Sequence, residues 1–235
     1  IRILHKNSFR DDPTRLFRAV RFAHRFGFTL EPTTRTCLSQ TIDGGYVDLI
    51  SNERLGAEMR KLLGERNPPS VLSLLDSCGL LRAIHPQWKV EKTTWGYLDQ
   101  YQGICLELGI LPTGLLYVAG TLAPLPEKIA EVITSRLALS NSEKHKVQRI
   151  TGLDPEVLRK LQGPLAPREI YHLLNSLPEE GLVILSSQTE NPLIHQKIKD
   201  YWFHLSSKSL YITGRDLLEI GYYPGPLLGQ TLKES

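Results

Sequence analysis

The stretch from Arg10 to Phe28, RDDPTRLFRAVRFAHRFGF, constrains this chain most, because it predicts one helix with a defined start and end. Asp12 is a suitable N-cap, Pro13 fits the first helical position, and Gly27 supplies a stop. Apolar residues recur every three or four positions and predict one packed face, formed by Leu16, Val20, Ala23 and Phe26. The arginines on the other faces are not needed for that packing, and they are the first indication of function.

Asp12 and Arg15 are three residues apart, so their side chains project side by side from the first helical turn. A carboxylate next to a guanidinium group presents hydrogen-bond acceptors beside donors, and such an edge can pair with a nucleobase. A capping carboxylate with an ordinary ion pair explains the same spacing. On spacing alone, both interpretations are open.

The longer string around this pair resembles the class II tRNA nucleotidyltransferases and the related bacterial poly(A) polymerases. The resemblance is carried by Ile3-Leu4-His5, Ser8-Phe9, the run from Asp11 to Ala23, and Gly27-Phe28. In that family, the stretch joins a catalytic head to a helical neck, and an acid-acid-x-x-arginine element reads the base of the incoming nucleotide. The resemblance therefore implies that Asp12 and Arg15 bind the nucleotide. Asp11 would be the supporting acid, in a place where the family often has glutamate.

Charge is unevenly distributed along the chain. Residues 1–36 carry eight Lys or Arg and three Asp or Glu, a balance of +5, whereas the whole chain carries only +3. Such an asymmetry favours a polyanionic partner for the N-terminal part. We therefore predict that Arg18, Arg21 and Arg25 bind RNA.

Composition and cysteine spacing exclude several other classes. No apolar run approaches the roughly 18 residues of a membrane span, and the N-terminus lacks a signal-peptide layout, so we expect a cytoplasmic protein without a membrane partner. Cys37, Cys78 and Cys105 are far apart and lack C-x-x-C spacing, which predicts reduced thiols rather than disulfides or a zinc site.

The segment Asp43 to Asp48, DGGYVD, superficially matches the glycine signature of the family's catalytic head. That signature needs a strand context and a downstream D-x-D pair to hold magnesium, and the chain contains no D-x-D. We interpret the segment as a loop between a helix that begins at Glu31-Pro32, capped by Thr29 or Thr33, and the next helix.

Ser51 is a suitable cap for a helix through Leu63. Within it, Arg54 and Glu58 are four residues apart and can form an ion pair. The family resemblance, which extends moderately over residues 51–86, implies instead that the two residues brace the neck beneath the nucleotide site. Either interpretation fits the sequence.

Helical patterning continues to the end of the chain, with proline-containing turns and no sustained strand alternation. We predict an all-α fold, an irregular multi-helix array with a neck (1–90), a body (91–209) and a short tail (210–235). Further helix starts are predicted at Pro68, the capping box Ser140 to Glu143, and the Asp154, Pro167, Pro178 and Pro192 positions. On the helix after Ser140, Lys144, Lys146 and Arg149 either face solvent or contact phosphate.

The segment from Thr213 to Gly229 is also similar to the C-terminal part of the tRNA nucleotidyltransferases, through its T-G-x-D-L-x-x-x-G-x-x-P-G-P-x-x-G pattern. Its glycines, Gly225 and Gly229, form a structural turn or face a phosphate.

Together the two terminal matches imply the C-terminal helical part of an enzyme that adds CCA, or its terminal A, to tRNA 3′ ends from ATP and possibly CTP. They also imply that Mg²⁺ and its carboxylates belong to a head that precedes Ile1. This chain would then contain no catalytic and no metal-binding residue, and it would be inactive alone. A poly(A) polymerase of the same family and a non-catalytic helical RNA-binding module are the alternatives.

Overall fold

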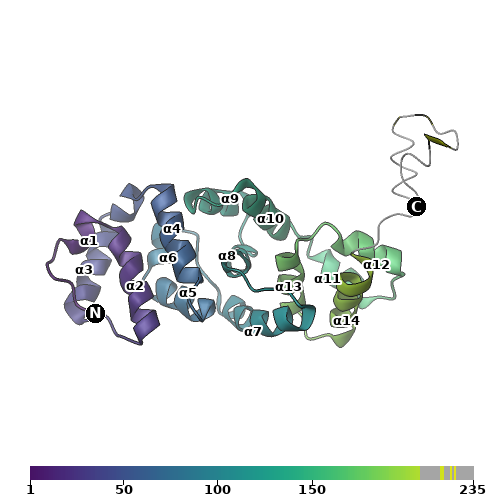
Figure 1. The fold of residues 1–235 in the computed structure, drawn as a ribbon, viewed down its shortest axis with the longest axis horizontal. Helices are drawn as coiled ribbons and strands as arrows, with labels where there is room; N and C mark the ends of the chain where they lie inside the picture. The colour runs from purple at the N-terminus through teal and green to yellow at the C-terminus, as the bar shows by residue number, and fades with distance from the viewer. Residues whose placement is uncertain (207–217, 220–222, 224, 226–235) are drawn as a thin grey trace.

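The computed structural model describes residues 1–206, 218, 219, 223 and 225, and in these ranges it contains helices and turns but no strand. Figure 1 shows the helices following one another along an elongated molecule, with the N-terminus near one end. The expected all-α, irregular multi-helix fold is confirmed.

The first group of helices contains the segment from which the sequence analysis began. Helix α2 packs against α4 and α5, and α1 packs against both α2 and α3. The group consists of α1 (Ser8–Asp11), α2 (Thr14–Phe26), α3 (Pro32–Asp43), the 3₁₀ turn η1 (Tyr46–Leu49), α4 (Asn52–Leu63), α5 (Pro68–Ser77) and α6 (Leu80–Ile84).

The second group lies in the middle of the molecule (Figure 1), where α13 returns to pack against α7 and α8. It consists of α7 (Lys92–Leu108), α8 (Gly114–Leu122), α9 (Glu127–Arg136), α10 (Asn141–Thr151) and α13 (Glu179–Ser187). The third group consists of α11 (Glu156–Gln162), α12 (Pro167–Leu174), α14 (Pro192–Asp200) and the π-helical turn η2 (Tyr201–Leu205).

Buried side chains join the first group to the second. The fully buried Trp88 donates from its indole Nε1 to Thr121 Oγ1 on α8 at 3.1 Å. Arg136, at the end of α9, donates from Nη1 to the carbonyl of Ile50 at 2.6 Å and from Nη2 to the carbonyl of Val47 at 2.8 Å. Apolar packing is therefore continuous across the predicted neck-body boundary at residue 90, and that boundary stays a prediction.

The ends of the helices follow local capping chemistry in most places. Ser51 accepts from the backbone N–H of Arg54, and Ser140 and Glu143 form the predicted reciprocal capping box. At α3, the prediction of Thr29 or Thr33 as the cap is wrong, because the longer side chain of Glu31 accepts from the Thr34 N–H instead.

Two further sequence expectations concern the glycine segment and the cysteines. DGGYVD is a glycine turn followed by η1, as the loop interpretation predicted. Cys37 and Cys105 are buried, Cys78 is half-buried, and all three are free thiols.

No helix in the described ranges is long and apolar enough to cross a membrane. The predictions on Thr213 and Gly229 lie outside the described residues.

Candidate nucleotide and RNA site

The start of α2 is shaped by hydrogen bonds from one residue to its neighbour. Asp12 has an extended backbone (φ −145°, ψ 96°), and Pro13 turns the chain into the helix. The carboxylate atom Asp12 Oδ1 accepts from the Thr14 N–H at 3.2 Å and from the Thr14 hydroxyl at 2.7 Å. Asp12 thus caps the first turn, although the helix begins at Thr14, one residue later than predicted.

The two oxygens of Asp12 have different surroundings. Arg54 Nη2 also donates to Oδ1, at 2.9 Å, so that this oxygen receives donors from Thr14 and from α4. The other oxygen, Oδ2, lies 3.9 Å from Arg15 Nε. Partial burial raises the pKa of the Asp12 carboxyl, but the hydrogen bonds from Thr14 and the charge of Arg54 outweigh it, so the pKa lies below its ordinary value. The carboxylate is ionised at neutral pH, with Oδ2 as its least committed acceptor.

The guanidinium of Arg15 is held on one side only. Its Nη1 donates to both the carbonyl and the hydroxyl of Ser8, each at 3.2 Å, which fastens α2 to α1. Among the described residues, Nη2 has no hydrogen-bond partner, and the side chain is 43% exposed. Asp12 Oδ2 and the free side of Arg15 therefore form an acceptor beside a donor. Asp11 is not part of this pair, because its carboxylate lies 3.8 Å from His5 Nε2.

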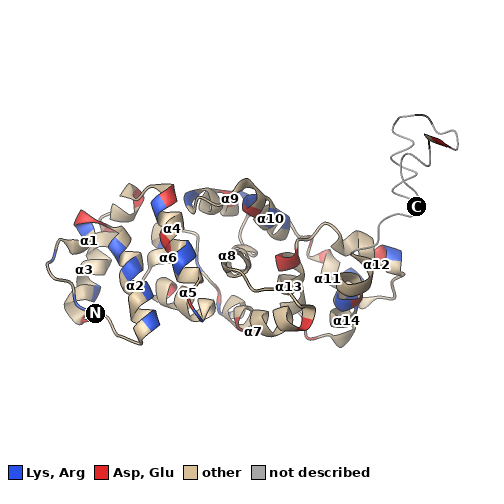
Figure 2. Ribbon diagram, in the orientation of Figure 1, with Lys and Arg blue, Asp and Glu red and all other residues tan. Residues whose placement is uncertain are grey.

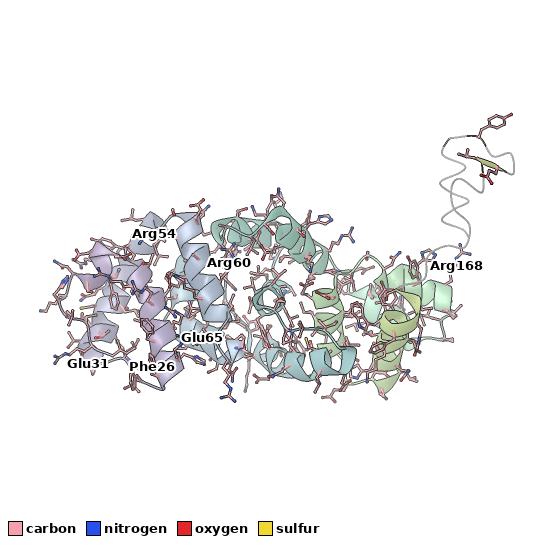
Figure 3. The ribbon with its side chains drawn as sticks, viewed as in Figure 1. Phe26, Glu31, Arg54, Arg60, Glu65 and Arg168 are labelled. Atoms are coloured by element: carbon pink, nitrogen blue, oxygen red, sulfur yellow. The ribbon has the colours of Figure 1, made fainter. Side chains whose placement is uncertain are left out.

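Arg54 and Glu58 do not form the ion pair that their spacing left open as one of two interpretations. Because α4 packs against α2, Arg54 reaches across to Asp12, and Glu58 bonds to Lys61 Nζ at 2.8 Å. Arg54 lies near the start of α4 (Figure 3), where its contact supports the carboxylate of Asp12. A bracing function for Arg54 stays a prediction, and this contact would provide it.

The arginines of α2 beyond Arg15 differ in how they are held. Arg25 donates to Glu65 through Nε at 3.0 Å and Nη2 at 2.6 Å, and Arg21 Nη1 lies 3.8 Å from the same carboxylate. The hydrogen bond from Arg25 is the main reason why the pKa of Glu65 lies below its ordinary value. Arg18 is exposed and has no charged partner in the part of the chain that the structure describes.

Helix α2 contains four arginines and no acidic residue, as the blue segments along it in Figure 2 show.

On α10, by contrast, basic side chains form hydrogen bonds with other parts of the protein. Lys146 Nζ donates to the buried Glu180 at 2.9 Å, and Arg149 donates to the carbonyl of Ser176 at 2.7 Å. These two residues are therefore neither simply solvated nor free for phosphate.

The structure also shows an aromatic surface that the sequence pattern missed. Phe26, expected on the packed face of α2, is 57% exposed, and Phe28 is 58% exposed. The spacing gave no decisive signal, because Phe26 follows both the buried Ala23 and the half-buried Phe22 at helical intervals.

A polar cleft of about 820 Å³ separates the end of α2 from α7 and α8. Its lining includes His24, Arg25, Arg66, Asn67 and Gln102. In the described ranges, no group of three or more His, Cys, Asp or Glu side chains could hold a metal ion.

Comparisons with known proteins find similarity to RNA-processing enzymes in both sequence and fold. The family described as "Probable RNA and SrmB-binding site of polymerase A" matches residues 27–92. An A-adding tRNA nucleotidyltransferase of Geobacter sulfurreducens is 29% identical over 238 residues, which cover 96% of this chain and 27% of that protein. The chain thus spans just over a quarter of the length of that relative.

Two solved structures share the fold. The Thermotoga maritima CCA-adding enzyme complexed with tRNA has a TM-score of 0.76, and a CCA-adding enzyme with CTP has a TM-score of 0.81; each is 22% identical. They cover 98% and 100% of this chain, and the chain covers 57% of each. The chain is therefore similar in sequence to tRNA nucleotidyltransferases, and it shares the fold of the helical portion of the CCA-adding enzymes.

Proposed function

We propose that this chain selects the nucleotide base and holds the RNA in an enzyme that adds CCA, or its terminal A, to tRNA 3′ ends. Nucleotidyl transfer itself would take place in a longer protein, with Mg²⁺ held outside this chain. The observation that carries the proposal is the pair at the start of α2, where Asp12 Oδ2 and the free side of Arg15 present an acceptor beside a donor.

Adenine and cytosine fit this edge. Each presents an amino donor next to a ring-nitrogen acceptor on its Watson–Crick edge, so a carboxylate accepts from the amino group while a guanidinium donates to the ring nitrogen. Guanine and uracil place a carbonyl acceptor where adenine and cytosine have the amino group, opposite the carboxylate. The proposed substrates are therefore ATP and, for a CCA-adding enzyme, CTP, in line with the names of the A-adding relative and the CTP complex.

Several residues support this function in the proposal. Arg54 braces Asp12 through Oδ1, Glu58 supports the same helix, and Asp11 adds negative charge at the corner between α1 and α2. Residues 1–90 form the neck, 91–209 the body and 210–235 the tail. The RNA is tRNA, bound in part by the arginines of α2, and the enzyme acts in the cytoplasm with other tRNA-processing enzymes.

Replacing Arg15 tests the base-reading function. In the longer protein, Arg15→Ala should lower the selectivity for ATP over GTP and UTP, because losing a hydrogen-bonded base contact costs about 1–3 kcal/mol, roughly 5- to 150-fold. The fold should remain intact, because the side chain is 43% exposed. Arg18→Ala, one turn further along the same helix, is the matched control. An unchanged nucleotide profile for Arg15→Ala would contradict the base-reading function.

A poly(A) polymerase is the second candidate, because the family that matches residues 27–92 is described for polymerase A. The two functions differ in product length. The longer protein should add only one to three nucleotides to a tRNA lacking its CCA end if the first proposal holds, and a long homopolymer if the second does.

A further inference from the structure

The solvent-facing side of α2 forms a continuous stripe. Arg15, Arg18, Phe22 and Phe26 follow at intervals of three or four residues and therefore lie on one side of the helix. The opposite side carries the buried residues Leu16, Val20 and Ala23. The stripe begins at the proposed base-reading arginine and extends for about 16 Å, at 1.5 Å per helical residue.

The C-terminal end of this stripe consists of aromatic rings. The rings of Phe22 and Phe26 are stacked, with centroids 6.2 Å apart and planes inclined by 27°. The ring centroid of Phe28, just beyond the helix, lies 5.6 Å from that of Phe26. Gly27, in the left-handed conformation (φ 65°), ends α2 and returns the chain so that Phe28 meets Phe26. Figure 3 shows Phe26 at the edge of the molecule, at the end of α2 remote from Arg54.

The charge beside these rings is positive. The guanidinium of Arg21 lies 4.7 Å from the centroid of the Phe22 ring, Arg25 is next to Phe26 in the sequence, and Arg18 is free of charged partners among the described residues. Exposed aromatic rings beside arginines, on a helix without an acidic residue, are the combination that binds unpaired nucleic acid, since bases stack on rings while phosphates approach the cations.

We propose that this stripe, extended by Phe28, binds the unpaired nucleotides that precede the 3′ end of the RNA, with bases stacked on Phe26 and Phe28 and a phosphate next to Arg18. The 3′ end itself then lies near Arg15, beside the incoming nucleotide. This inference rests on the proposed function, because that function places the nucleotide at Arg15. A double-stranded segment does not use the surface in the same way, since its bases are already stacked on one another.

Replacing phenylalanine by leucine separates stacking from general apolar contact, because leucine retains apolar surface but has no ring. Fluorescent oligoadenylate is titrated with the chain, and in parallel with the longer protein, for the wild type and the variants Phe26→Leu, Phe28→Leu and Phe26→Tyr. We expect Phe26→Leu to weaken binding by about fivefold or more, and Phe26→Tyr to bind as the wild type does. A blunt RNA duplex should bind all variants equally. Both phenylalanines are more than half exposed, so the variants should fold.

Several results would overturn the proposal. If Phe26→Leu and Phe28→Leu bind oligoadenylate as the wild type does, while Arg18→Gln binds more weakly, the surface contacts phosphate only. If Phe26→Leu lowers the melting temperature of the longer protein but not of the chain, another part of that protein covers the rings. If neither the chain nor the longer protein binds any RNA, the RNA component of the proposed function fails as well. Base reading is tested separately by Arg15→Ala. If that variant loses nucleotide selectivity, the base-reading function stands even where the RNA-binding proposal fails.

Discussion

Gly56 marks a close approach between the first and second groups of helices. It lies inside α4, and a Cβ built on it would overlap the carbonyl oxygen of Leu137 at the end of α9. Arg60 on α4 contacts the same segment, because its Nη2 donates to the carbonyl of Ala138 at 2.8 Å. We predict that Gly56→Ala destabilises the protein, because a backbone carbonyl cannot rotate away from the added methyl group as a side chain could.

The magnitude follows from two opposing effects. Alanine is favoured over glycine inside a helix by about 0.5–1 kcal/mol. Overpacking of a close contact costs about 1–3 kcal/mol. The net effect of Gly56→Ala should be a loss of about 1–2 kcal/mol in the free energy of unfolding, which lowers the melting temperature by about 2–8 °C in a chain of this size.

Gly103 provides the matched control. It also lies inside a helix, α7, but a Cβ there would meet no atom within 4 Å. Gly103→Ala should therefore raise the free energy of unfolding by about 0.5–1 kcal/mol. Thermal unfolding followed by circular dichroism at 222 nm measures both variants. If Gly56→Ala were as stable as Gly103→Ala, the close approach of α4 to the end of α9 would be refuted.

Two further predictions concern the arginines of α2. Because Arg25 lowers the pKa of Glu65 below its ordinary 4.5, the ion pair stabilises the fold fully above that pH and loses its effect as pH falls. Glu65→Gln should thus lower the melting temperature at pH 7, with the difference from wild type shrinking below pH 4.5; a pH-independent difference would contradict the ion-pair account. Titration of fluorescent tRNA at several salt concentrations should show that replacing Arg18, Arg21 and Arg25 together by Gln flattens the salt dependence, with Arg18→Gln alone reducing the slope by about one. An unaltered slope in the triple variant would place the RNA path elsewhere.

The sequence predicted most helix starts and ends because these depend on neighbouring residues. Ser51, the pair Ser140 and Glu143, and Gly27 each act within a few positions of the helix end that they form. The error at Glu31 has the same local origin, since a glutamate rather than a threonine accepted the free N–H.

Contacts between helices could not be read from spacing. Arg54 and Glu58 are well placed for a pair on an isolated helix, but packing of α4 on α2 gave Arg54 a partner in Asp12. In the same way, Glu65 accepts from Arg25 across forty residues of sequence. The exposure of Phe26 is likewise not specified by any periodicity in α2 alone.

The hydrogen bonds of Arg136 have a consequence for the order in which the chain assembles. Its guanidinium donates hydrogen bonds to the carbonyls of Val47 and Ile50, which lie 89 and 86 residues earlier. During synthesis at about 5–20 residues per second, these carbonyls emerge roughly 4–18 s before their partner. In a nascent chain that stops short of Arg136, the segment between η1 and α4 therefore lacks the hydrogen bonds that α9 supplies in the folded protein.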